Sequence, residues 1–99
     1  MSYNGIANCL LKKNDVNGAI NTYRKSIEIN PNNKFAYNGL GTCYDNLNDR
    51  HNAINHFNKA IEIDKDFSYP YNGLGNLHYF NHDFSQALPF YETAVRLSP

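Results

Sequence analysis

The sequence predicts an all-α fold: an α-solenoid of three antiparallel helix-turn-helix repeats that form a segment of a right-handed superhelix. Two observations predict it. The five residues YNGIA at 3–7 return as YNGLG at 37–41 and again at 71–75, a period of 34 residues. Within each unit, apolar residues recur every three or four positions in two separate runs, which is the period of an amphipathic helix. A fixed period of this length is typical of stacked helical units.

The repeats place the helices in order along one domain, residues 1–99. We assign repeat 1 to residues 1–33, repeat 2 to 34–67 and repeat 3 to 68–99. First helices are expected near 2–13, 35–47 and 69–80, and second helices near 16–29, 50–63 and 84–97. The turns inside the repeats hold Asn14-Asp15, Asn48-Asp49 and His82-Asp83. Asn suits a left-handed helix terminus, and Asp suits the N-cap of the helix that follows.

The columns of the repeat predict how the helices pack. Small residues on the first helices face small residues on the second helices, and a large aromatic residue on each second helix fills the wider gap toward the next unit. The small columns are Ala7, Gly41, Gly75 and Ala19, Ala53, Ala87; the aromatic column is Tyr23, Phe57, Tyr91. Pro31 and Pro99 are expected to end their second helices, with Asp64 serving at the middle boundary. Pro89 should remove a backbone hydrogen bond from the last helix or bend it.

These residues resemble the tetratricopeptide repeat, whose pattern is W-x2-L-G-x2-Y, then A-x3-F, then A, then P. The middle unit matches it with Tyr37 in the tryptophan place, followed by Leu40, Gly41, Tyr44, Ala53, Phe57 and Ala60. The first unit departs at Ala7 and Leu10, and the third has His78 in the tyrosine place. The resemblance implies a protein-binding scaffold.

Composition narrows the class of partner. Nine basic and nine acidic residues give a formal net charge of zero, so no basic surface for nucleic acid or for a membrane is expected. No run approaches the roughly 18 apolar residues that span a bilayer. We therefore expect a soluble, cytoplasmic protein, with the nucleus left open, and a protein or peptide partner. Cys9 and Cys43 are expected to be reduced core residues.

No catalytic or cofactor motif is found, so the chain is predicted not to be an enzyme and to need no cofactor. No serine or cysteine stands in a nucleophile motif. His78 and His82 are four residues apart, but no third metal ligand is evident.

The resemblance implies that the first helices line a concave groove. The residues expected in the groove are two polar columns, two adjoining glycines and one aromatic residue. The first column is Asn4, Asn38 and Asn72, the second is Asn8, Thr42 and Asn76, the glycines are Gly39 and Gly73, and the aromatic residue is Tyr79. Residues four apart share one helix face. Amides carry donors and an acceptor, so such a ladder could hydrogen-bond the backbone of a bound peptide. The alternative is codon bias, because seventeen of the 99 residues are asparagine.

Other features of the groove leave alternatives open. The helical glycines Gly5, Gly39 and Gly73 either give room to a ligand backbone or let neighbouring first helices pack closely. Phe35, Tyr69, Tyr79 and Phe80 either form apolar pockets at the groove rim or cover neighbouring units.

The resemblance allows the binding surfaces of two known types of family member to be compared with the matching positions of this sequence. The carboxylate clamp of chaperone-binding members is missing, because its places hold Asn4, Gly39, Tyr69 and Gly73, and only Asn8 fits. The asparagine-lined superhelix of the O-linked N-acetylglucosamine transferase is similar in chemistry, but its ladder falls one residue later, at the glycines.

The functional prediction is a scaffold that binds a partner segment in this groove. The alternatives are an assembly module of a larger complex and a substrate-binding arm of a larger enzyme such as a glycosyltransferase. Because a capping helix is missing, we expect a piece of a longer array whose Leu88, Tyr91 and Val95 face water and permit end-to-end self-association. The identity of the partner and the pathway stay open.

Overall fold

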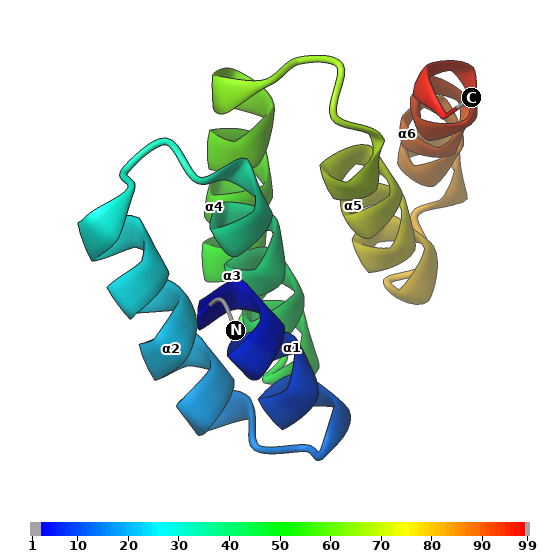
Figure 1. Ribbon diagram of the computed structural model, residues 1–99. Helices are drawn as coiled ribbons and strands as arrows, with labels where there is room; N and C mark the ends of the chain where they lie inside the picture. The colour runs from blue at the N-terminus through cyan, green and yellow to red at the C-terminus, as the bar shows by residue number, and fades with distance from the viewer. Residues whose placement is uncertain (1–2, 99) are drawn as a thin grey trace.

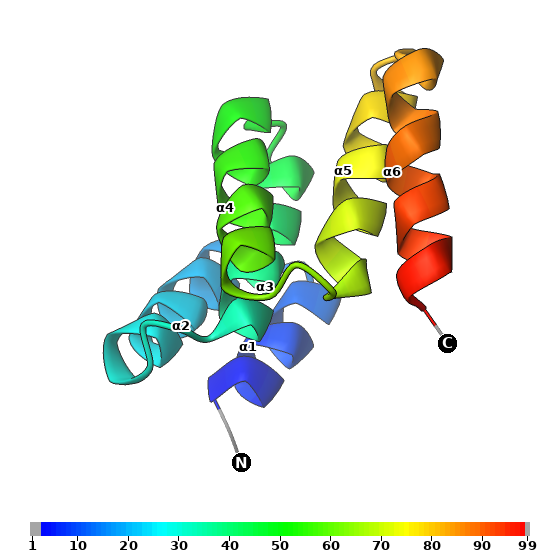
Figure 2. The same cartoon turned by 90° about the horizontal axis from the view of Figure 1, so that it is seen from above.

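The computed structural model describes residues 3–98, which fold into six helices and no strand (Figure 1). The helices form three antiparallel pairs in a row, and the pairs are seen from above in Figure 2. The bounds are α1 Tyr3–Lys12, α2 Val16–Ile29, α3 Lys34–Asn46, α4 Arg50–Ile63, α5 Ser68–Phe80 and α6 Phe84–Leu97. The predicted all-α solenoid is confirmed, and the three second helices begin and end at the predicted residues. The predicted helix start at residue 2 and the role of Pro99 lie outside the described residues.

The turns inside the repeats have the predicted left-handed residue in all three cases and the predicted aspartate cap bond in the first two. Asn14, Asn48 and His82 have φ angles of 66°, 59° and 62°, in the left-handed region. The carboxylate of Asp15 accepts a hydrogen bond from the Gly18 amide at 3.0 Å, and Asp49 caps α4 in the same way. These bonds satisfy amide donors that have no partner inside the helix. Asp83 occupies the same place before α6, without a side-chain cap bond.

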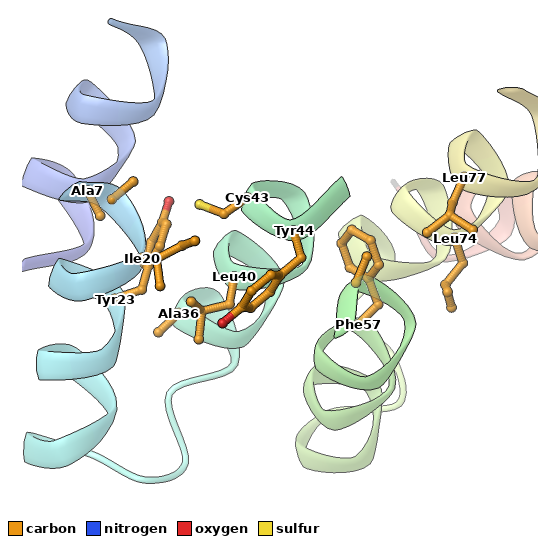
Figure 3. Close-up of a cluster of buried hydrophobic side chains, with 12 residues drawn as sticks. Ala7, Ile20, Tyr23, Ala36, Leu40, Cys43, Tyr44, Phe57, Leu74 and Leu77 are labelled. Carbon is orange, nitrogen blue, oxygen red and sulfur yellow. The ribbon is translucent and has the colours of Figure 1, made fainter. Parts of the chain in front are cut away.

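The large aromatic rings of the first two repeats are wedged between first helices, as Figure 3 shows for Tyr23 and Phe57. A Cβ atom built on Gly41 would lie 2.6 Å from the Phe57 ring, and one built on Gly73 of the next unit would also lie 2.6 Å from it. Tyr23 stands in the same relation to Gly39 of the next unit. Ring and glycine therefore fit together as knob and hole, which fixes the spacing between neighbouring units.

Of two further sequence-based predictions, one is resolved and one is corrected. The last helix, α6, runs through Pro89 without interruption, so the proline removes one backbone hydrogen bond, the first of its two predicted effects. Pro89 and Ser85, whose carbonyl loses its usual donor, are both exposed, so water can solvate that carbonyl. Cys9 is not a core residue: it is an exposed free thiol, whereas Cys43 is completely buried. The difference arises because α2 covers the Cys43 side of α3, while no helix within residues 3–98 covers the Cys9 side of α1.

None of the six described helices has the length and apolar character needed to cross a membrane.

Candidate functional site

A concavity of about 220 Å³ opens on the side formed by the first helices. It extends from α1 across α3 to the start of α5, and these helices are direct neighbours. The lining residues are Asn4, Asn8, Leu11, Tyr23, Phe35, Asn38, Gly39, Thr42, Phe67 and Tyr69. Five of the nine predicted groove residues are thus brought together: Asn4, Asn8, Asn38, Gly39 and Thr42. We call this concavity the groove.

Asn4 is bound within the protein. Its amide oxygen accepts a hydrogen bond from the Ser26 hydroxyl at 2.8 Å, and its Nδ2 donates to Asn33 Oδ1 at 3.2 Å. Asn33 in turn donates to Ser26 at 2.9 Å and caps α3 through the Ala36 amide. Asn4 therefore ties α1 to the end of α2 and to the start of α3, which is a structural role.

Asn38 occupies the same place one repeat later but lacks these partners. The counterparts of Ser26 and Asn33 are Ala60 and Phe67, and neither side chain carries a hydrogen-bonding group. As a result, Oδ1 of Asn38 is buried and has no hydrogen-bond partner among residues 3–98. An unsatisfied buried carbonyl of this kind costs about 1–3 kcal/mol.

Asn72, the third member of this column, is exposed and lies outside the groove. It lines a second depression, of about 240 Å³, between α5 and the end of α6. The other lining residues there are Ser68, Tyr69, Ala94, Val95 and Ser98. The three asparagines of the first column therefore stand in three different environments, although their sequence pattern is uniform.

The second polar column follows the aromatic column of the same repeat. Asn8 accepts a hydrogen bond from the Tyr23 hydroxyl, and Asn76 accepts one from Tyr91 at 2.5 Å. The middle repeat has Phe57, which has no hydroxyl, and its column holds Thr42 instead. The amide carbonyls are therefore occupied by aromatic hydroxyls. The Nδ2 donor of Asn8 has no hydrogen-bond partner within residues 3–98, and it lies at the groove.

Both tyrosine hydroxyls stay protonated donors. Burial, with a smaller contribution from the nearby Cys43, raises the pKa of Tyr23 to about 12. Burial also raises the pKa of Tyr91, to which Tyr79 adds. Protonated hydroxyls keep Asn8 and Asn76 oriented through their carbonyls, so each amide group presents its nitrogen away from the aromatic ring.

The glycines beside the columns serve inter-repeat packing. A Cβ on Gly39 would lie 2.2 Å from the Tyr23 ring, and one on Gly73 would meet Phe57. The space that these glycines leave is filled by a ring from the second helix of the preceding unit. This differs from both predicted explanations, room for a ligand and direct contact between neighbouring first helices.

An aromatic cluster closes one end of the groove. The rings of Phe35 and Tyr69 meet Phe67 edge to face at centroid distances of 5.1 Å and 5.5 Å. Phe67 is buried, whereas Phe35 and Tyr69 are 56% and 64% exposed. Both rings line the groove, and Tyr69 also packs on Phe67 of the preceding repeat, so the two predicted roles are combined. The rings offer a surface for an apolar side chain.

The charges next to this cluster compensate each other. The ammonium of Lys34 lies 4.9 Å from the centre of the Phe67 ring and pairs with Asp64. The hydrogen bond from Lys34, together with one from the Asp66 amide, lowers the pKa of Asp64. In the described part of the chain, no Lys, Arg, Asp or Glu side chain lines the groove itself.

Four predicted residues lie elsewhere: Asn72, Gly73, Asn76 and Tyr79 do not line the groove. Tyr79 packs against the exposed rings of Phe80 and Phe84 at 5.4 Å and 5.3 Å, at the far end of the third repeat. Three residues line the groove without having been predicted there: Leu11, Phe67 and Tyr23, which was predicted only as a packing residue. Leu11 follows Asn8 by three residues on the same helix face, which was an available signal. Phe67 carried none, because its counterpart in the first repeat is Asn33.

His78 takes part in inter-repeat packing. Its Nδ1 lies 2.9 Å from Nη2 of Arg50, and its ring stacks on Phe90. Its Nδ1 also lies 3.9 Å from the Asp83 carboxylate. Among residues 3–98, no three His, Cys, Asp or Glu side chains gather as a metal site would require.

Comparisons with solved structures find the same fold in other proteins. The structure is similar to the first TPR domain of human RPAP3, with a TM-score of 0.89 and 21% identity over 98% of this chain and 76% of that chain. It is similar to the second TPR of Spaghetti (RPAP3) bound to the HSP90 peptide SRMEEVD, with a TM-score of 0.85 and 20% identity over 97% and 89%. It is also similar to MamA, with a TM-score of 0.82 and 22% identity over 96% of this chain and 56% of that chain. Identities this low establish the fold alone.

A search of curated proteins finds no match. The sequence does match the family model described as tetratricopeptide repeat, at residues 1–33 and 35–67. The two matches cover two thirds of the chain and agree with its first two repeats to within one residue. The third unit, which has His78 in the tyrosine place and Pro89 inside its second helix, forms the same helical hairpin in the structure. The chain belongs to the tetratricopeptide repeat family.

Proposed function

We propose that this chain is an interaction scaffold whose groove holds an extended segment of a partner protein. Tetratricopeptide repeats are generally non-catalytic interaction modules, and the related Spaghetti domain is seen with a bound peptide. The observation that carries the proposal is the composition of the groove. Exposed aromatic rings at one end stand beside an unused amide donor and a threonine.

These groups suit different parts of a peptide. The rings of Phe35 and Tyr69 take an apolar side chain, whose burial contributes about 1.5–3 kcal/mol. The Nδ2 of Asn8 donates to a backbone carbonyl, which any residue of the partner supplies. A partner bound in this way is recognised by one apolar anchor side chain and by its main chain.

The groove favours an uncharged segment. The peptide SRMEEVD carries three acidic side chains, and the groove offers no cation to them. Lys34, whose ammonium lies beside the Phe35 and Phe67 rings, is already paired with Asp64. Because desolvating an unpaired carboxylate is expensive, acidic segments are disfavoured. We therefore expect a partner chemistry different from that of the Spaghetti complex.

The experiment uses a display library of random peptides of the length of SRMEEVD, selected on the immobilised chain. Enrichment of peptides with one aromatic or branched aliphatic residue and with few Asp or Glu supports the proposal. Selection of acidic peptides, or no enrichment above an unrelated helical protein, contradicts it.

Variants locate the binding site. Phe35→Ser and Tyr69→Ser remove exposed rings at the groove, and Phe80→Ser removes an exposed ring that does not line it. Loss of at least tenfold in peptide affinity is expected for the first two and no change for the third. Asn8→Asp retains the acceptor for Tyr23 but replaces the donor by an anionic oxygen, so it also weakens binding. Equal effects of Phe80→Ser and Tyr69→Ser would refute the assignment to the groove.

A further inference from the structure

We propose that a second copy of this chain docks head to tail on the first, with α1 of the second copy against α6 of the first. The proposal concerns a surface separate from the groove. The protein displays the same kind of junction twice within one chain, where α2 packs on α3 and α4 packs on α5 (Figure 2). The outer face of α6 and the outer face of α1 are the two halves of a third such junction.

The α6 half is a stripe of apolar residues along one helix face. Phe84, Leu88, Tyr91 and Val95 follow one another at helical spacing, and Leu88 and Val95 are 59% and 75% exposed. Their counterparts one and two repeats earlier are covered by the next unit. Ile20 is buried, and Ile27, Ile54 and Ile61 are partly buried against the core. Within residues 3–98, α6 packs on α5 alone.

The α1 half shows the complementary difference. Cys9 is exposed, whereas its counterparts Cys43 and Leu77 are buried, because α2 and α4 cover them. Ile6 is likewise exposed, and its counterpart Leu40 is buried. A helix packed on this side of α1 in the manner of α2 on α3 would cover both residues.

The repeat predicts the register of the contact. In the first junction, Tyr23 lies beside Cys43 and Gly39 (Figure 3). Shifting by whole repeats of 34 residues places Tyr91 of one copy beside Cys9 and Gly5 of the next. Glycine thus stands at the place where both existing junctions need it.

The same shift can be applied to the polar contact of the second junction. In the second junction, Arg50 approaches the carbonyl of Leu77 and the ring of His78. The matching residues across the proposed junction are Phe84 on one copy and Cys9 and Leu10 on the next. An exposed aromatic ring there meets apolar residues in place of the polar contact. Both halves are apolar, so burial drives the association.

Such a contact joins two different surfaces, so each copy can bind one neighbour at each end. We therefore expect the sedimentation coefficient to rise with protein concentration. Leu88→Glu blocks the α6 half and Cys9→Glu blocks the α1 half, and each variant alone should be monomeric. Leu47→Glu places the same charge at a similarly exposed leucine in the α3–α4 turn and should leave association unchanged.

Mixing the two blocked variants gives the decisive measurement. Leu88→Glu retains an intact α1 half and Cys9→Glu an intact α6 half, so the mixture should form a dimer of one copy of each. Formation of the mixed dimer also shows that both variants are folded. A monomeric wild-type chain at high concentration, or self-association that survives in Cys9→Glu alone, would overturn the proposal. The groove variants Phe35→Ser and Tyr69→Ser should associate normally. A failure of the chain to self-associate would therefore not count against peptide binding in the groove.

Discussion

Replacing Gly39 by alanine should destabilise the protein, although alanine is the better helix former. The substitution alone favours a helix by about 1 kcal/mol. The new Cβ, however, would lie 2.2–2.6 Å from three atoms of the Tyr23 ring, where about 3.5–4.0 Å is the optimal separation. The ring is buried, so it cannot move away without displacing its neighbours.

The magnitude follows from the opposing contributions. Overpacking a core costs about 1–3 kcal/mol, and displacing the ring also strains the hydrogen bond from Tyr23 to Asn8, worth about 0.5–1.5 kcal/mol. After subtracting the helix preference, we expect Gly39→Ala to lower the free energy of unfolding by about 1–3 kcal/mol. For a domain of this size, each kcal/mol lowers Tm by roughly 4–8 °C.

A double-mutant cycle tests the cause. Tyr23→Leu removes the Cε and Cζ atoms that the new methyl group would meet. In that background, Gly39→Ala should stabilise the protein by up to about 1 kcal/mol, so the sign of its effect reverses. Urea unfolding followed by far-UV circular dichroism gives all four free energies. An effect of Gly39→Ala that is the same with and without Tyr23 would refute the knob-and-hole packing.

Two further predictions concern the asparagine columns and the cysteines. Ser26→Ala should lower the free energy of unfolding by about 1–3 kcal/mol, because it leaves the Asn4 carbonyl without its donor. Ala60→Ser should not destabilise the protein, since it offers Asn38 the equivalent donor. A stability loss for Ala60→Ser as large as for Ser26→Ala, measured by urea unfolding, would contradict this. In an alkylation experiment followed by mass spectrometry, the exposed Cys9 should be modified long before Cys43. Burial raises the pKa of the Cys43 thiol from 9.0 to about 11, so little reactive thiolate is present there. Because the folded state holds this proton more tightly than the unfolded state, the stabilisation is fully present below about pH 9 and is lost as pH rises through about 11. Equal reaction of the two thiols at neutral pH would be inconsistent with the packing of α2 on α3.

The fold could be predicted because three copies of one pattern report on the same hairpin. A single helix end is ambiguous in one sequence, but Asp15, Asp49 and Asp83 mark the same start three times, and the observed second helices begin directly after them. The repeat also predicted the aromatic column that separates the units.

The site could be predicted only in part, because periodicity reports positions and not partners. Asn4, Asn38 and Asn72 share a column, yet their environments differ through single changes at Ser26 and Asn33 in other columns. Cys9 and Cys43 likewise occupy equivalent places, and only the presence of a preceding helix buries one of them. Differences of this kind between repeats arise from packing between neighbouring units. The sequence pattern of a single unit holds no information about that packing.

The central claim is that the groove holds the partner segment, and NMR titration tests it most directly. A peptide selected from the display library is added to the isotope-labelled chain, and chemical shifts are followed for backbone and side-chain amides. We predict the largest changes at Asn8 Nδ2 and at the amides of Thr42 and Tyr69, which line the groove. Asn21 and Asn55, exposed on α2 and α4, should not shift. Largest changes at Asn21 and Asn55, with Asn8 and Tyr69 unmoved, would contradict the account.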